Sequence, residues 1–261
     1  MSGKRFADNK KKKSKTKKNT KGRKIKIFLL NLLQLVFLGL MIFSGTKIYN
    51  WYIENKKSSD QLNEISECVD SEGGEFKIDF EALKQKNPDT VGWLKVENTL
   101  VEYPVVRTGD NDFYLTHSFD KSYNSAGWAF MDFTNTNIEK DKNVVIYGHN
   151  RRDDSMFGTL KNILQPEWYN NAQNKYVTFI TETGNYKYEV FSVYQIEKED
   201  YYIQTAFNDN KFEEFIKTIK SRSVKDFEVE VTSDDNILTL STCANDNKYR
   251  IVLHAKKETT Q

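Results

Sequence analysis

The sequence predicts a mostly β fold, preceded by helices and by one apolar segment long enough to cross a membrane. From Val91 onward, short runs of β-branched and aromatic residues are separated by turn residues, a pattern typical of an all-β barrel or sandwich. Ile27–Gly45 contains 19 residues without a charge, close to the roughly 20 that span a bilayer as a helix. A chain of 261 residues is long enough for one well-buried domain with appendages.

Charge is distributed unevenly along the chain. Residues 1–26 carry 13 Lys and Arg against one acid, Asp8, and the other 26 basic and 36 acidic residues give the rest a net −10. Such a block of like charge indicates a solvated arm, and its Lys tract alone would also suit nucleic acid. The apolar segment that follows favours the membrane, and the positive-inside rule then places residues 1–26 in the cytoplasm and the chain after Lys47 outside. A cleaved signal peptide ending near Ser44-Gly45-Thr46 is the alternative.

Two helical segments are expected between the apolar span and the β-rich region. Ile48 to about Glu67 is polar with scattered apolar residues, which indicates a helical stalk. Phe80–Lys86 is expected to form a short helix that ends at Asn87-Pro88, because the residue before a proline is disfavoured in a helix. The chain thus divides into a cytoplasmic tail, a transmembrane signal-anchor helix, a stalk and a globular domain, at residues 1–26, 27–46, 47–87 and 88–261.

Eight strands and two covering helices are expected in the globular domain. Apolar spacings of three and four residues predict helices at Ser155–Leu164 and Asn208–Ile219, each with one face on the sheet. The strands are expected near Val91–Val96, Leu100–Val106, Gly127–Asp132, Asn143–Tyr147, Lys175–Thr181, Tyr186–Ile196, Asn236–Ser241 and Arg250–Lys256.

The end of one apolar strand carries a cysteine. Cys243 follows the run from Ile237 and precedes a polar turn, so a rigid sheet would hold its thiol within reach of a substrate. A buried structural cysteine would instead continue the apolar run. In an exported chain a disulfide with Cys68 is a further alternative.

His149 and Arg250 have comparable positions. His149 follows the apolar run Val144–Tyr147 after Gly148, expected to form an exit turn, and a thiol nucleophile needs such an imidazole to exchange protons with it and with the leaving amine. Arg250 opens the last strand, which a hairpin would bring back beside Cys243, where a guanidinium could stabilise an oxyanion. Two other cysteine peptidase layouts fit less well. Papain-like enzymes have the cysteine before the histidine, and chymotrypsin-like cysteine proteases have the right order but usually a Gly-rich nucleophile turn.

Taken together, these residues resemble a sortase, and more narrowly a class B sortase. The run from Thr239 to Cys243 matches the TLxTC nucleophile motif of that family, with Arg250 in the following strand and His149 after an apolar strand. The similarity extends from about Gly92 to Lys256. The helix near Asn208–Ile219 and the helical region before the barrel resemble class B. The resemblance implies an eight-stranded sortase-type β-barrel with N-terminal helices and a cover helix before the nucleophile strand.

The same resemblance implies a membrane-anchored cysteine transpeptidase of Gram-positive cell surfaces. Such an enzyme would cleave an Asn-Pro-x-Thr-like signal near the C-terminus of a secreted protein after the Thr, form a thioacyl intermediate on Cys243, and pass the acyl group to an amine of peptidoglycan or of its lipid-linked precursor. The residues that it implies for the signal groove, with Thr242 contributing backbone to the oxyanion site, are Asn111, Leu115, Tyr202, Ile203, Ser241 and Thr242.

Neither a metal nor a cofactor is expected, because three histidines and two cysteines at these spacings resemble no zinc ligand set. His117, in a polar loop, and His254, in the last strand, are expected to be structural. Two other functions stay open. A secreted hydrolase would use the same catalytic residues with water as acceptor, and a non-catalytic scaffold would hold Cys243 inert or bonded to Cys68.

Overall fold

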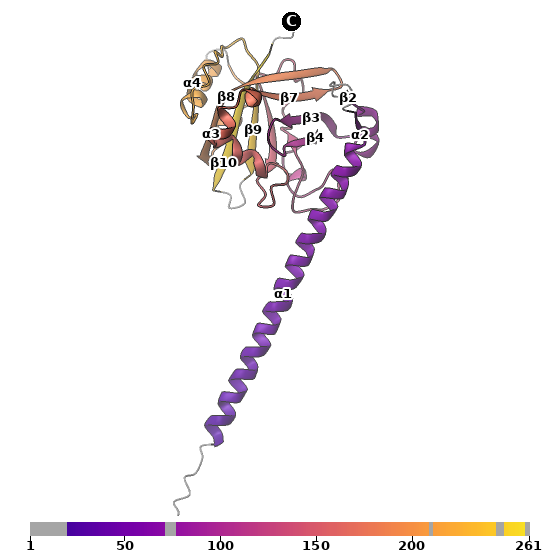
Figure 1. Ribbon diagram of the computed structural model, residues 1–261, viewed down its shortest axis with the longest axis vertical. Helices are drawn as coiled ribbons and strands as arrows, with labels where there is room; N and C mark the ends of the chain where they lie inside the picture. The colour runs from indigo at the N-terminus through magenta and orange to yellow at the C-terminus, as the bar shows by residue number, and fades with distance from the viewer. Residues whose placement is uncertain (1–19, 71–76, 209–210, 244–247, 259–261) are drawn as a thin grey trace, which may run out of the picture. The chain divides into compact units, whose positions relative to one another are not determined.

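The computed structural model describes residues 20–70, 77–208, 211–243 and 248–258, and the chain forms two compact units, Met1–Tyr52 and Ile53–Gln261. Helix α1 (Thr20–Ser66) is drawn from indigo to purple in Figure 1. Its stretch from Gly22 is long and apolar enough to cross a membrane, and its large apolar side chains up to Ile53 are exposed. The helix continues through Gly45, since one glycine costs a helix only about 1 kcal/mol. The predicted basic tail lies mostly outside the described residues.

The second unit is built on a closed barrel of eight strands in the order β10-β8-β7-β3-β4-β5-β6-β9, which confirms the predicted fold class. Two neighbouring pairs, β4 with β5 and β6 with β9, are parallel, and the other pairs are antiparallel. The strands are β3 (Thr90–Val96), β4 (Glu102–Val106), β5 (Phe130–Met131), β6 (Asn143–His149), β7 (Tyr176–Thr181), β8 (Gly184–Glu197), β9 (Ile237–Cys243) and β10 (Tyr249–Lys257).

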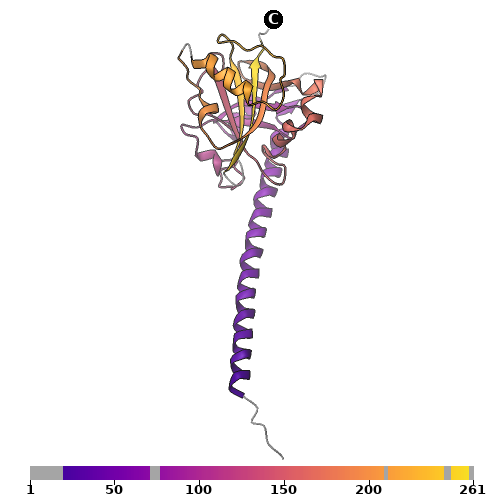
Figure 2. The ribbon, with the colours of Figure 1, turned by 90° about the vertical axis from the view of Figure 1, so that its left-hand side faces the viewer.

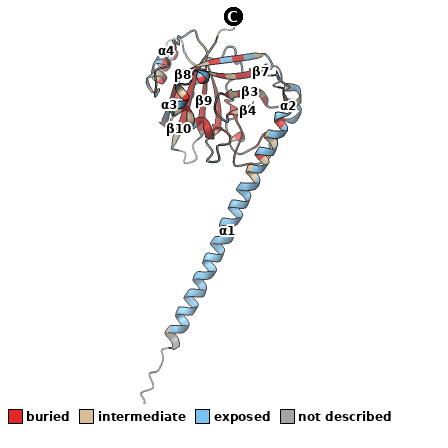
Figure 3. Cartoon of the chain, viewed as in Figure 1, coloured by how far each residue is buried: buried red, intermediate tan, exposed pale blue. Residues whose placement is uncertain are grey.

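Most residues of β4, β6 and β10 are buried, and Figure 3 shows red along much of the barrel. In β6 the first six residues are all buried, which explains why the strand reads as an apolar run rather than an alternating one. The strand also extends two residues beyond the predicted Tyr147. Gly148 is therefore not a turn residue but lies inside β6, where a Cβ would stand 2.5 Å from the ring of Phe157.

Short elements connect the strands. A two-stranded sheet that was not expected, β1 (Val69–Asp70) with β2 (Lys77–Ile78), precedes helix α2 (Phe80–Lys86), which ends before Pro88 as predicted. The stretch expected as a helix at Ser155–Leu164 is instead the 3₁₀ helix η3 (Gly158–Leu164). The remaining short helices are η2 (Phe113–Leu115), α3 (Pro166–Tyr169), η4 (Ala172–Lys175) and η5 (Tyr201–Ile203).

Helix α4 (Lys211–Ser221) covers β8, β9 and β10, and Figure 2 shows it in orange across the yellow strands. Its buried residues Phe212, Phe215, Ile216 and Ile219 recur at the predicted spacing of three and four, and they form a second apolar core with Tyr194 of β8, Ile237 of β9 and Val252 of β10. The covering role predicted for this helix is confirmed, and a separate core lies between the helix and the three strands.

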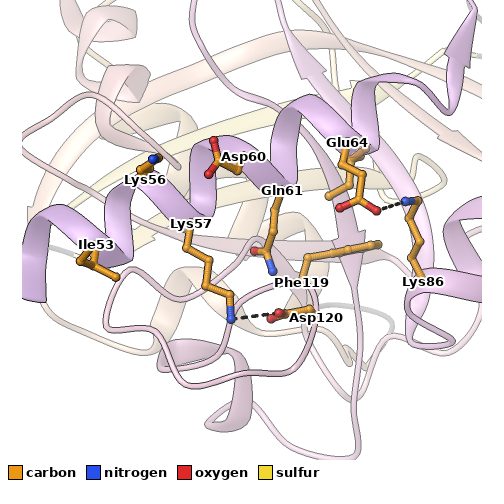
Figure 4. Close-up of a pocket in the computed structure, with 10 residues that line it drawn as sticks. Ile53, Lys56, Lys57, Asp60, Gln61, Glu64, Lys86, Phe119 and Asp120 are labelled. Carbon is orange, nitrogen blue, oxygen red and sulfur yellow. Dashed lines mark hydrogen bonds and ion pairs between the residues drawn. The ribbon is translucent and has the colours of Figure 1, made fainter.

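The last turns of α1, from Ile53, pack on the barrel within the second unit. Ile65 is buried in the main core, and ion pairs join Lys57 to Asp120 at 3.0 Å and Glu64 to Lys86. Figure 4 shows both pairs beside a hollow of about 640 Å³ between this helix and Phe119. Because both ion pairs are exposed and contribute little, the burial of Ile65 in the main core is what chiefly holds these turns in place.

Candidate active site

Strand pairing brings the three predicted catalytic positions into one row. β6 and β9 run parallel, with His149 and Cys243 as direct partners at the last residue of each strand. β10 runs antiparallel to β9 with Val252 opposite Ser241, and Arg250 lies two residues before Val252, toward the end of β9 that carries Cys243. Because neighbouring strands lie about 5 Å apart, the backbones of all three positions fall within about 10 Å.

The imidazole of His149 is held in one orientation. Its Nε2 lies 2.9 Å from the carbonyl oxygen of Leu115. Since a carbonyl only accepts hydrogen bonds, Nε2 carries the proton in the neutral ring, and Nδ1 is the basic nitrogen. The backbone N–H of Phe157 donates to the carbonyl of His149 at 2.9 Å, so the loop after the histidine folds back and fixes its main chain.

The surroundings of His149 favour its neutral form. Burial lowers the pKa of His149 below its usual value, and the positive charges of Arg151 and Arg250 lower it further, against an opposing effect of the hydrogen bond to Leu115. The imidazole is therefore available as a base at neutral pH.

Arg250 and Thr242 belong to the pairing between β9 and β10. Arg250 is buried, and its guanidinium donates to the carbonyl of Tyr249 at 3.0 Å. The Thr242 side chain is buried, and its Oγ1 accepts from the backbone N–H of Ile251 at 2.9 Å. This bond joins β9 to β10 through Thr242 and Ile251, the residues next to Cys243 and Arg250.

The residues expected to line a signal groove form two groups in the structure. Tyr202 and Ser241 are both buried and bonded to each other at 3.0 Å between their hydroxyl oxygens, while Ile203 is half-buried beside them. Asn111 and Leu115 are half-buried and belong to the second group. Leu115 contacts the site through its carbonyl on His149, and Asn111 donates to Asp132 at 2.8 Å.

Three residues that the sequence did not single out support this arrangement. Asp132 accepts hydrogen bonds from Asn111 and from the hydroxyl of Tyr147, each at 2.8 Å, and Tyr147 is two residues before His149. Gly127 has a φ of +61°, and a Cβ there would lie 2.8 Å from Cδ2 of His149. The position of Asp132, a charged residue at the end of a predicted strand, could have drawn attention to it. The sequence contained no comparable signal for Gly127.

The structure also bears on the second cysteine and on possible metal ligands. Cys68 is a buried free thiol, so the alternative of a disulfide with Cys243 is not realised. Among residues 20–70, 77–208, 211–243 and 248–258, His, Cys, Asp and Glu side chains form no group of three or more that could hold a metal ion. A neutral imidazole and a guanidinium flanking a cysteine position suit acyl transfer through a thiolate.

Comparison with known proteins identifies the family. The model of the sortase domain matches residues 94–258. Sortase B of Listeria monocytogenes is 37% identical over 245 residues, covering 89% of this chain and 98% of that protein. Sortase B of Staphylococcus aureus is 34% identical over 235 residues, covering 87% and 96%.

Solved structures of sortase B proteins are also similar to this chain. The X-ray structure of Clostridium perfringens sortase B matches with a TM-score of 0.64 and 40% identity, covering 69% of this chain and 100% of that one. The crystal structure of the Staphylococcus aureus enzyme matches with a TM-score of 0.66 and 32% identity, covering 82% and 99%. The chain therefore belongs to the sortase family, in its sortase B group, and is a cysteine transpeptidase that acts on proteins bearing sorting signals.

Proposed function

We propose that this sortase B cleaves an Asn-Pro-x-Thr-like signal after the Thr and transfers the new C-terminus to an amine of peptidoglycan or of its lipid-linked precursor. The observation that carries the proposal is the direct pairing of His149 with Cys243 at the ends of β6 and β9, with Arg250 near the start of the adjacent strand β10. The thiol of Cys243, the imidazole of His149 and the guanidinium of Arg250 supply the nucleophile, the acid–base group and the oxyanion stabiliser that both half-reactions need.

In the first half-reaction, Nδ1 of His149 takes the thiol proton, and the Cys243 thiolate attacks the carbonyl carbon of the Thr. Arg250 stabilises the oxyanion that forms. The C–N bond breaks as the imidazolium protonates the leaving amine, and a C–S thioester remains. In the second half-reaction the acceptor amine attacks the thioester, gives a proton to His149 and displaces the thiolate.

We also propose that the protein is a single-pass membrane protein with its N-terminus in the cytoplasm and residues after Lys47 outside. The apolar helix from Gly22 and the 13 basic residues before position 27 support this orientation. The partners are then secreted proteins with a C-terminal sorting signal, and the acceptor is at the cell surface.

The test uses the full-length chain in detergent micelles with a fluorogenic Asn-Pro-x-Thr peptide, with and without an amine acceptor. Cleavage with Thr joined to the amine is expected for the native sequence, and Cys243→Ala and His149→Ala are expected to abolish it. Cys68→Ala is the matched control, because burial raises the pKa of that thiol and keeps it protonated, so its activity should equal that of the native chain.

Cleavage by water alone, at the same rate with and without amine, would favour a hydrolase. A panel of signal peptides left intact, together with a Cys243 thiol that resists alkylation in the folded protein, would instead favour a non-catalytic scaffold. Activity that survives in Cys243→Ala would contradict the assignment of the nucleophile.

A further inference from the structure

A chain of buried polar side chains crosses four strands of the barrel. Tyr194 of β8 lies 2.9 Å from Nε2 of His254 in β10, and Nδ1 of His254 lies 2.8 Å from Oγ1 of Thr239 in β9. Thr239 Oγ1 lies 2.7 Å from Oδ1 of Asn143, the first residue of β6, and Asn143 Nδ2 donates to the carbonyl of Gln204 at 2.8 Å. The four side chains are almost completely buried.

The Gln204 carbonyl sets the direction of every bond in this chain, because it only accepts. Asn143 must turn its amino group toward Gln204 and its amide oxygen toward Thr239, so the Thr239 hydroxyl donates to that oxygen. The hydroxyl then accepts from His254, which requires a proton on Nδ1. His254 Nε2 is left as an acceptor for the hydroxyl of Tyr194. A single tautomer therefore satisfies all four groups.

The imidazole of His254 is kept neutral by its surroundings. Its ring is packed among Phe191, Tyr194 and Phe215, with ring centroids 5.5–6.3 Å away. Burial lowers the pKa of His254 to about 3, and the charge of Arg222 acts in the same direction. The bond pattern is thus the same throughout the neutral pH range.

The chain ends on a segment that adjoins the candidate site. Gln204 directly follows η5, whose Tyr202 is bonded to Ser241 two residues before Cys243. Thr205 adds a contact with Thr134 at 2.7 Å between hydroxyl oxygens. The segment 201–205 is therefore joined to the nucleophile strand twice, directly through Ser241 and indirectly through Asn143 and Thr239.

We propose that Asn143, Thr239 and His254 are positioning residues whose hydrogen-bond chain holds the segment 201–205 against the nucleophile strand, and so fixes one wall of the signal groove. Thr239 lies four residues from Cys243, a span of about 13 Å along a strand, so the chain acts on substrate binding rather than on the reacting atoms. The groove at Tyr202 and Ile203 is the one expected from the resemblance to class B sortases, and the inference rests on the proposed function.

The test compares two substitutions of Thr239 in the full-length chain. Thr239→Val keeps the shape of the side chain but removes the hydroxyl, which leaves Nδ1–H of His254 and Oδ1 of Asn143 without partners. Thr239→Ser keeps the hydroxyl and serves as the conservative rescue. We expect the KM for the signal peptide to rise about tenfold in Thr239→Val with kcat changed less, and to stay close to the native value in Thr239→Ser.

Two measurements do not depend on activity. Amide hydrogen exchange across 201–208 is expected to be faster in Thr239→Val than in the native chain and in Thr239→Ser, with exchange in β4 unchanged. In the native chain, ¹⁵N NMR is expected to show His254 protonated at Nδ1 only, which tests the bond pattern even if Thr239→Val fails to fold.

A His254 protonated at Nε2, or unchanged exchange across 201–208 in a folded Thr239→Val, would overturn the proposal. A fall in kcat with no change in KM would do the same, since it would assign Thr239 to the chemical step. If the native chain cleaves no signal peptide, the proposed function fails. The exchange and NMR results still decide whether the hydrogen-bond chain through Asn143, Thr239 and His254 holds the segment 201–205.

Discussion

Replacing Gly127 with alanine is expected to destabilise the protein and to displace the candidate base. Gly127 has a φ of +61°, and a Cβ there would stand 2.6 Å from the carbonyl oxygen of Tyr114, 2.9 Å from that of Leu115 and 2.8 Å from Cδ2 of His149. Two of the three contacts are with backbone oxygens, which cannot rotate away as a flexible side chain would.

The magnitude follows from two costs. An alanine in the left-handed region costs about 1–2 kcal/mol, and overpacking of a tightly filled site costs about 1–3 kcal/mol more. The free energy of unfolding should therefore fall by roughly 2–5 kcal/mol. For a domain of this size each kcal/mol lowers Tm by about 2–4 °C, so a decrease of roughly 4–20 °C is expected.

Activity should fall as well, because the Leu115 carbonyl that the new methyl group would push is the one bonded to Nε2 of His149. A displacement of about 1 Å at a catalytic group costs up to about 100-fold, so kcat/KM for the signal peptide should decrease by roughly 10- to 100-fold. Thermal unfolding and peptide cleavage of the full-length chain measure the two effects.

Gly109→Ala is the matched control, since a Cβ at Gly109 meets nothing within 4 Å. Its unfolding free energy should change by less than about 0.5 kcal/mol. Equal unfolding temperatures for Gly127→Ala and Gly109→Ala would contradict the claim that Gly127 is too closely packed to accept a Cβ. A Gly127→Ala protein that is destabilised but fully active would instead refute the role assigned to His149.

Three further predictions concern the buried groups. Between pH 6.5 and about 3 the unfolded chain binds a proton at His254 that the folded chain does not bind. As the pH falls through this range, the native chain should therefore lose up to about 1.4 kcal/mol of unfolding free energy per pH unit relative to His254→Gln. Urea unfolding of the two proteins at several pH values measures this difference. A difference that does not change with pH would contradict a neutral buried imidazole. Ile219→Ala, in the buried face of α4, should lower the unfolding free energy by about 2–5 kcal/mol. Lys217→Ala, on the exposed face, should lower it by less than about 0.5 kcal/mol. Equal losses in the two variants would argue against the second core. A double-mutant cycle of Tyr202→Phe and Ser241→Ala should give a coupling energy of about 0.5–1.5 kcal/mol, and additive losses would mean that the two hydroxyls do not interact.

Much of the barrel could be predicted from local sequence patterns. The eight apolar runs, the amphipathic helix before the nucleophile strand and the helix stop at Asn87-Pro88 each depend on residues close together in the chain. The stretch at Ser155–Leu164 was predicted as a helix and forms a 3₁₀ helix only from Gly158, where the backbone lies so close to Arg151 that a Cβ would stand 2.4 Å from its carbonyl oxygen. Apolar spacing alone cannot register such a contact.

By itself, the sequence determined that an apolar span precedes a β-rich domain, that the chain resembles a sortase, and that a cysteine, a histidine and an arginine lie at strand ends. The folded structure was needed to show that β6 pairs in parallel with β9, which makes His149 and Cys243 neighbours although they are 94 positions apart in the chain. It also decided that Nε2 of His149 is bonded to Leu115, that Gly127 leaves room for that ring, and that His254 is part of a buried chain of hydrogen bonds. Apolar periodicity reports which face of an element is buried, whereas the partner of a strand or of a buried polar atom depends on how distant segments pack, and a single sequence does not contain that information in local form.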